Sequence, residues 1–384
     1  MKKTILWLSL SAAAVVLLAE WTDNGHIWQG LRECYFRGYR DAKVDDLPFK
    51  TFRTIPASEA PRAWPLHDRF TSSLPDAVRD STEACGTVAL AVVHRDSLLL
   101  DWTSDQVDGA DTMRTNAFSM AKTFTAFAIG TAVTRGLLSV DDPVSRYLPR
   151  FREGPGAELT IRQVLQMRSG IPFGESYRNP VGFMARSTYG HGILKRTASY
   201  DVNGEAGVPW KYQGGNTLIL QEVLLSLIDV PLGIWFAETV WQPLGAAEDA
   251  AWAVDDQGHE RNYCCFYSRA TEYARLGQLL LDTGRVDSVQ LIDRAFMEEL
   301  MTPVGPLPDG DDIQHYGYQV WMGTHRGHAF TSMQGLHGQY IVAVPDLDLV
   351  AVRTGFDRPK GKLRHIDGDV YNTLNLAFNL ADSR

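Results

Sequence analysis

The 384-residue sequence has few cysteines and no excess of positive charge, and both features exclude classes of protein. Four cysteines are too few for a disulfide scaffold, and none has the CxxC spacing of a zinc site. Cys264 and Cys265 are adjacent, and whether either bonds to Cys34 or Cys85 stays open. The net charge of -9, without an offsetting basic stripe, makes nucleic acid an unexpected partner.

Several catalytic motifs are also missing. No GxSxG elbow occurs, which disfavours an α/β-hydrolase. No HExxH occurs and the ten histidines are scattered, so we expect neither a catalytic metal nor a cofactor. His94-Arg95-Asp96 resembles a kinase catalytic loop, but no GxGxxG or DFG accompanies it.

Only one long apolar run is present, residues 5–19, and two lysines precede it. It is shorter than the roughly 20 residues of a comfortable membrane span and fits a signal-peptide core of about 7 to 15 residues. Leu17 makes a poor cleavage site before Glu20, so residues 1–19 are expected to be a signal peptide or a membrane anchor. Both alternatives predict an exported body, either periplasmic or tethered to the inner membrane and facing the periplasm.

Two segments follow the leader. Residues 20–80 are interrupted by prolines, which predicts an irregular N-terminal arm, and residues 81–384 are expected to form one domain. In that domain, β-rich runs at 86–94 and 97–102 predict a hairpin. Helical spacing marks residues 121–138, 161–167, 218–228 and 270–282.

The carboxyl-terminal part returns to strand patterns. Strands are predicted at 318–322, 339–344 and 349–354, and a closing helix at 370–381. We therefore predict an α+β fold in which an antiparallel sheet is built from both termini, flanked by helices, with an inserted helical region.

The sharpest local signal is Ser119-Met-Ala-Lys122. On a helix, residues i and i+3 share a face, so the hydroxyl and the amine can approach within hydrogen-bond reach. Residues 121–132 hold no other charge and are largely apolar, which indicates a buried helix. Burial disfavours an ammonium ion, and a neutral amine is the base that a serine nucleophile needs. The alternative is that Ser119 only caps the helix.

Tyr212 is a second candidate, in a Gly-bearing loop before a helix expected from about Thr217. A tyrosine on such a loop can hold its hydroxyl in a cleft and relay a proton to or from Ser119 or a leaving group. Without the serine and the lysine, an aromatic side chain that packs the loop would be the preferred interpretation.

Candidate substrate contacts come from two further regions. Gly335, His337 and Gly338 stand at the start of a predicted strand, where the backbone can approach a ligand closely and offer an N–H to an oxyanion. His337 is equally consistent with a surface histidine in a turn. Tyr177 and Tyr189 belong to the loop 173–189, where they either line the cleft or pack it.

Several stretches together resemble the serine β-lactamase and penicillin-binding protein superfamily, nearest its class C branch. These stretches are 119–122 (SMAK), 136–143 (GLLSVDDP), 159–170 (LTIRQVLQMRSG), 241–245 (WQPLG) and 273–277 (YARLG). The resemblance covers about residues 87–381 and is strongest toward 6-aminohexanoate-oligomer hydrolases and esterases. It implies a β-lactamase/transpeptidase-like fold, with Ser119 as acylated nucleophile, Lys122 as its base partner and Tyr212 as proton relay.

Two motifs depart from the class C pattern. Tyr212 precedes Gln213-Gly214 where Tyr-x-Asn is usual, and residues 333–335 (MQG) replace Lys-Thr-Gly, so no lysine is expected to hold a β-lactam carboxylate. We expect an exported serine hydrolase that cleaves small linear amides or esters through an acyl-enzyme. The alternatives are a D-Ala peptidase or weak β-lactamase, and a catalytically idle binder of cell-wall peptide.

Overall fold

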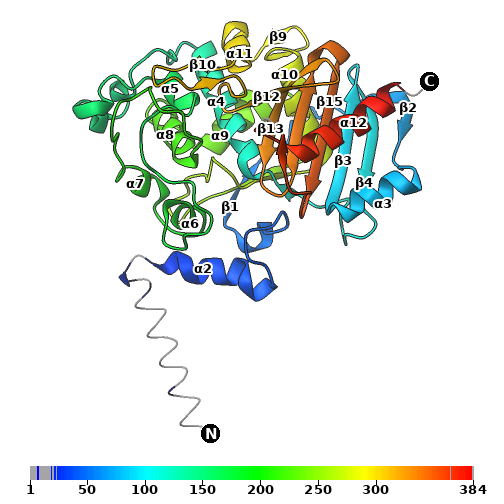
Figure 1. Cartoon of the computed structure of the whole chain (residues 1–384), viewed down its shortest axis with the longest axis horizontal. Helices are drawn as coiled ribbons and strands as arrows, with labels where there is room; N and C mark the ends of the chain where they lie inside the picture. Colours follow the sequence, from blue (N-terminus) through cyan, green and yellow to red (C-terminus); the bar gives the residue numbers. More distant parts are fainter. Residues whose placement is uncertain (1–6, 8–18, 20, 23, 364, 383–384) are drawn as a thin grey trace.

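A seven-stranded sheet of order β12-β13-β14-β15-β3-β4-β2 forms one side of the molecule in the computed structural model (Figure 1). The structure describes residues 7, 19, 21–22, 24–363 and 365–382, so most of the predicted leader lies outside the described residues. The strands of this sheet are β2 (Leu66–Thr71), β3 (Thr87–His94), β4 (Ser97–Thr103), β12 (Trp321–His325), β13 (His328–Gly335), β14 (Gln339–Val344) and β15 (Leu349–Gly355).

The two ends of the chain meet at the centre of this sheet, as predicted. β3 pairs antiparallel with β15, with Ala91 opposite Val352, and β3 and β4 form the expected hairpin. One detail of the prediction is wrong, because β2 runs parallel to β4 and the sheet is therefore mixed. The long connection through α3 (Asp76–Ala84) makes the parallel pairing feasible.

Helices cover both faces of the sheet, and this explains why every residue of β3 is buried. Alternate side chains of a strand point to opposite faces. Leu90 and Val92 therefore enter the core beneath α12 (Gly368–Asp382), whereas Ala91 and Val93 enter the larger core. The α10 helix (Ala270–Leu281) packs on that second face, against β3, β14 and β15.

The predicted helical insertion lies beside the sheet (Figure 1). Its helices are α4 (Ala121–Thr134), α5 (Ile161–Leu165), α6 (Phe183–Tyr189), α7 (Ile193–Thr197), α8 (Gly214–Leu225), α9 (Leu232–Phe236) and α11 (Arg294–Leu300). A second sheet has the order β1-β6-β7-β5, from β1 (Phe52–Ile55), β6 (Ala250–Ala253), β7 (Phe266–Ser268) and β5 (Thr115–Asn116). The remaining short strands are β8 (Arg285–Val286), β9 (Val289–Gln290), β10 (Gly305–Pro306), β11 (Asp312–Ile313), β16 (Lys362–Leu363) and β17 (Ile366–Asp367).

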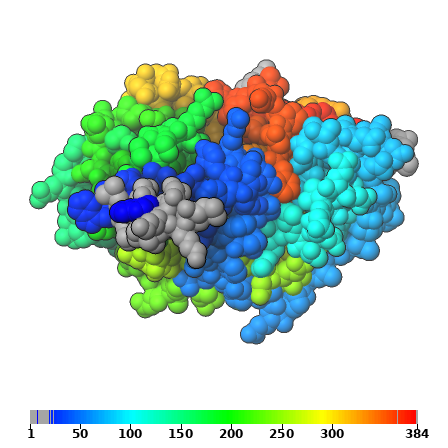
Figure 2. Space-filling view, turned by 90° about the horizontal axis from the view of Figure 1, so that it is seen from below, coloured from blue at the N-terminus to red at the C-terminus, as the bar shows by residue number. Residues whose placement is uncertain are grey.

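The segment 20–80 is more regular than the irregular arm that the sequence predicts. It contains α2 (Gly25–Glu33), β1 and β2, and the start of α3. The prolines stand outside these elements or at their ends: Pro56 follows β1 and Pro65 precedes β2. Figure 2 shows part of this blue segment on the surface, between the green helical region and the cyan strands. Within the described part of the chain, no helix is long and apolar enough to span a bilayer.

Candidate active site

Ser119 and Lys122 are in direct contact at the start of α4. Ser119 lies in the 3-10 turn Phe118–Met120, which leads straight into that helix. Lys122 is 1% exposed, and its Nζ donates to Ser119 Oγ at 2.9 Å and to the backbone oxygen of Tyr263 at 3.1 Å. The i, i+3 spacing thus brings the two predicted residues together. The second acceptor fixes the direction in which the amine points.

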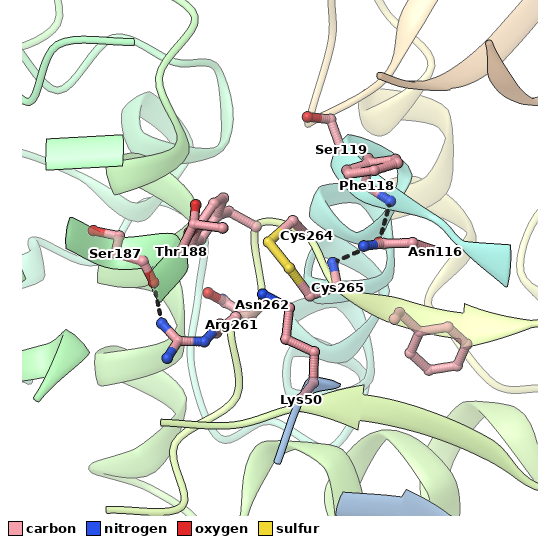
Figure 3. The surroundings of a disulfide bond; sticks show 12 residues. Lys50, Asn116, Phe118, Ser119, Ser187, Thr188, Arg261, Asn262, Cys264 and Cys265 are labelled. Carbon is pink, nitrogen blue, oxygen red and sulfur yellow. Dashed lines mark hydrogen bonds between the residues drawn. A yellow bond between two sulfur atoms is a disulfide. The ribbon is translucent and has the colours of Figure 1, made fainter. Parts of the chain in front are cut away.

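The backbone before Ser119 is held in an uncommon conformation. Phe118 has φ +45, which bulky residues seldom adopt. Asn116 Oδ1 accepts the N–H of Phe118 at 2.9 Å and that of Cys265 at 3.2 Å (Figure 3). Its Nδ2 donates to the buried carboxylate of Asp46 at 3.1 Å. These bonds stabilise a strained turn next to the proposed nucleophile, where such strain is often found.

A disulfide joins the adjacent residues Cys264 and Cys265 (Figure 3). Cys34 and Cys85 are free thiols. The sequence left this pairing open. The bond closes a ring in the segment that supplies both the carbonyl of Tyr263 to Lys122 and the N–H of Cys265 to Asn116. The disulfide therefore restricts the backbone that orients the catalytic candidates.

Ser119 opens into a cleft of about 380 Å³. Its lining residues come from the helical region, from β12 and β13, and from the segment after β15: Ser119, Glu175, Tyr177, Trp210, Tyr212, His315, Trp321, Gln334, Gly335, Leu336, Arg358, Lys362, His365 and Asp367. A concave site between a sheet and a helical region is a common location for ligand binding.

Tyr212 lines this cleft beside the serine and the lysine. Its ring centroid lies 4.9 Å from Lys122 Nζ, and the ring packs against Tyr316 and Trp321 with centroids 6.0 and 5.4 Å away. Among the described residues, no hydrogen bond joins the Tyr212 hydroxyl to Ser119 or Lys122. The three predicted catalytic residues thus share one site, and the tyrosine contacts the lysine through its ring.

Glu175 is a cleft residue that the sequence reasoning missed. Its carboxylate accepts the Tyr177 hydroxyl at 2.7 Å and the N–H of Gly214 at 2.8 Å. Gln213 makes two further hydrogen bonds to the same loop: its Oε1 accepts the N–H of Gly174, and its Nε2 donates to the backbone oxygen of Ile171. These bonds join the loop after α5 to the start of α8 and fix the position of the neighbouring Tyr212.

Two of the five predicted substrate contacts line the cleft, Gly335 and Tyr177. Gly335 ends β13 where that strand passes the turn before Ser119. A Cβ on Gly335 would lie 2.3 Å from the backbone oxygen of Ala117. The absence of a side chain at Gly335 therefore permits the close approach of β13 to the serine.

The other three predicted contacts lie outside the cleft lining, and each has a structural role. Tyr189 packs on Gly30 of α2 and its hydroxyl contacts Cys34 Sγ at 3.2 Å. His337 is buried, with Nε2 3.0 Å from the backbone oxygen of Ala42, and burial lowers its pKa. Gly338 has φ +82 and its carbonyl accepts from Arg353. Residues 336–338 thus form the turn between β13 and β14, and of the motif 335–338 only Gly335 and Leu336 line the cleft.

Positive charge at the cleft is a further correction. No lysine is present at residues 333–335, where the class C pattern has Lys-Thr-Gly, yet Arg358 and Lys362 line the cleft from the segment that follows β15. The basic composition of residues 358–363 (RPKGKL) was visible in the sequence. Because this segment is far from Ser119 along the chain, the sequence alone could not show that the two lie close together in space.

Comparisons with known proteins agree with this architecture. The family model described as Beta-lactamase matches residues 74–362. A 6-aminohexanoate-dimer hydrolase from Paenarthrobacter ureafaciens is 25% identical over 327 residues, which cover 78% of this chain and 80% of that protein.

Among solved structures, a family VIII carboxylesterase superposes with a TM-score of 0.64 at 16% identity, covering 82% of this chain and 98% of that one. A D-stereospecific amidohydrolase from Streptomyces sp. gives a TM-score of 0.60 at 17% identity, covering 79% and 99%. These two likenesses show the shared α+β fold. The family match covers well over half of the described chain, and the chain is therefore a hydrolytic enzyme of the Beta-lactamase family.

Proposed function

We propose that this enzyme cleaves small linear amides or esters through an acyl-enzyme on Ser119. The observation that carries the proposal is the 2.9 Å hydrogen bond from the buried Lys122 amine to Ser119 Oγ in the cleft. A serine becomes a nucleophile when an adjacent base accepts its proton. The names of the relatives, a 6-aminohexanoate-dimer hydrolase, an amidohydrolase and a carboxylesterase, support amides and esters as the substrate class.

The proposed reaction has two stages. Ser119 Oγ attacks the substrate carbonyl while Lys122 Nζ takes the hydroxyl proton, and a tetrahedral oxyanion forms. Backbone N–H groups at the start of α4 and at the end of β13 are the candidate donors for that oxyanion. The C–N or C–O bond then breaks, and a leaving amine takes up the proton that Lys122 accepted, relayed by Tyr212. Water attacks the resulting ester by the reverse path, which releases the acid and restores Ser119.

Labelling with a fluorophosphonate probe tests the proposal. Wild-type protein should be labelled and should hydrolyse a p-nitrophenyl ester. The Ser119→Ala variant should show neither reaction while its melting temperature stays close to that of wild type, because this change removes one hydroxyl. Near-normal turnover by Ser119→Ala would refute the assignment. Folded wild-type protein without any label would favour the idle binder.

Tyr212→Phe is expected to slow amide hydrolysis more than ester hydrolysis. An amine must be protonated as it leaves, whereas p-nitrophenolate leaves without a proton. We expect the ratio of amide to ester kcat/KM to fall by about 10² relative to wild type. The matched pair is a p-nitrophenyl ester and an alkyl amide of one acid. If kcat/KM fell equally for the amide and the ester, Tyr212 would not be the proton relay and would only pack the cleft.

We also propose that the folded body is exported, on the strength of the two lysines and the apolar run in residues 1–19. Alkaline phosphatase fused after residue 40 should be active in a bacterial host, because that reporter folds only outside the cytoplasm. A fusion that lacks the leader provides the control. An inactive full-length fusion would contradict export, whether the leader is cleaved or retained as a membrane tether.

A further inference from the structure

One end of the cleft carries two cations from the segment that connects β15 to β17. Arg358 is neutralised within the protein, because its guanidinium pairs with the Asp367 carboxylate at 2.7 Å. Lys362 starts β16 and faces Asp367 across the β16–β17 pair. Among the described residues, however, no carboxylate lies within 4 Å of Lys362 Nζ. Its ammonium lies 5.8 Å from the ring centroid of Trp321, which also lines the cleft.

The other titratable groups of the cleft do not neutralise Lys362. His315 stacks on His365 at 4.0 Å. Burial first, and then the proximity of His365 and of the Lys362 ammonium, lowers the pKa of His315 to about 4. It is therefore uncharged near neutral pH. The Glu175 carboxylate forms no ion pair with Lys362 within 4 Å and instead accepts hydrogen bonds from Tyr177 and from the backbone of Gly214. Within the part of the chain that the structure describes, Lys362 thus lines the cleft without a carboxylate partner.

We propose that Lys362 is a specificity-determining residue that binds a carboxylate of the substrate, so that the enzyme prefers amides or esters bearing a negative charge. This inference rests on the proposed function. An ammonium–carboxylate bond is stronger than a bond between neutral groups. The Trp321 indole adds a cation–π contact and a low-dielectric wall, both of which keep the ammonium at the cleft. Lys362 thus supplies, from a different part of the chain, the positive charge that residues 333–335 lack in place of Lys-Thr-Gly.

Matched substrates test the proposal without fixing in advance which half of the substrate carries the charge. The acyl-side pair is p-nitrophenyl adipate monoester and its analogue with a carbamoyl group in place of the carboxylate. The leaving-group pair is p-acetoxybenzoate and p-acetoxybenzamide. In each pair the two members have nearly the same size and differ by one charge.

The variant is Lys362→Met, which keeps an unbranched apolar stem one atom shorter than that of lysine and removes its charge. In at least one pair, kcat/KM for the anionic member should fall about tenfold, while the neutral member stays within about twofold of wild type. Added salt should slow the wild-type reaction with that anion and have little effect on the variant. Lys360→Met is the matched control, since Lys360 belongs to the same segment but lies outside the Ser119 cleft lining.

Four outcomes would overturn the inference. Equal effects of Lys362→Met on the charged and neutral members would assign it a general packing role. An equal loss of kcat/KM for the anionic substrate in Lys360→Met would show that the lysines act only by long-range attraction of the anion and not by binding it in the cleft. Ester turnover that depends on Ser119 but does not distinguish charge would refute the inference and leave the proposed function intact. Absence of turnover that depends on Ser119 would contradict both.

Discussion

The Lys122→Met variant is expected to hydrolyse a p-nitrophenyl ester with a kcat/KM about 10³ lower than wild type. Methionine is unbranched and apolar, so it fills the space of the buried lysine stem between α4 and the Tyr263 segment. It cannot accept the proton of Ser119, whose Oγ then has no base within hydrogen-bond reach. The rate of fluorophosphonate labelling should fall in parallel, because it depends on the same activated hydroxyl.

A matched control separates this effect from the loss of a positive charge near the cleft. Lys211 is exposed and precedes Tyr212, so Lys211→Met removes a charge without touching the serine. We expect its kcat/KM to stay within about twofold of wild type, because exposed charges are well screened. If folded Lys122→Met retained more than about a tenth of wild-type activity, Lys122 could not be the base.

The local part of the site could be predicted from the sequence because it depends on one helix. Ser119 and Lys122 are three residues apart, and the apolar composition of α4 indicates burial without any knowledge of the fold. The sheet was also predictable in outline, since the strand patterns are β-rich and cluster at the two ends of the chain. The sequence did not predict the parallel strand β2, because none of its residues is buried and its sequence, LHDRFT, lacks an apolar run.

The rest of the site depends on contacts between distant residues. Lys362 and Glu175 meet Ser119 only after β15, β13 and the loop after α5 have been placed by the fold. Periodicity in one segment carries no information about its neighbours in space. The same reason explains why the sequence could not decide whether Tyr189 lines the cleft or packs elsewhere, because its partners in and just after α2 are distant along the chain.

The prolines of residues 20–80 predict an irregular arm for a definable physical reason. Proline interrupts a helix or a central strand, so a segment rich in proline looks irregular. Here Pro56 and Pro65 stand just outside β1 and β2, and α2 contains no proline. The prolines mark the ends of the elements and do not prevent them. The segment between them carries the buried Asp46, which supports Asn116 and the turn before Ser119.

Lys50→Met is expected to lower the free energy of unfolding by about 3 to 5 kcal/mol. The ammonium of Lys50 pairs with Glu33 of α2 and lies 4.0 Å from Asp46, and all three side chains are at most 4% exposed. Removing the cation leaves two carboxylates buried without their shared partner. Urea denaturation would measure the loss as a lower midpoint at an unchanged m value.

The pH dependence of that loss has a definite sign. Burial already raises the pKa of Asp46, and the nearby Lys50 opposes this shift. Without Lys50 the folded-state pKa should rise further above the unfolded value, and such a group destabilises the fold only while it is ionised. The deficit of Lys50→Met should therefore shrink as the pH is lowered through the raised pKa of Asp46 toward the ordinary Asp value of about 3.9.

A second change distinguishes an unpaired charge from a packing defect. Adding Glu33→Gln to Lys50→Met removes one of the two unpaired carboxylates, so the double variant should be more stable than Lys50→Met alone. Lys43→Met is the control, because Lys43 pairs at 3.0 Å with the exposed Asp41 and should cost less than about 1 kcal/mol. If Lys50→Met cost no more than this control, or if Glu33→Gln deepened its loss, the three side chains would be held by packing and not by their charges.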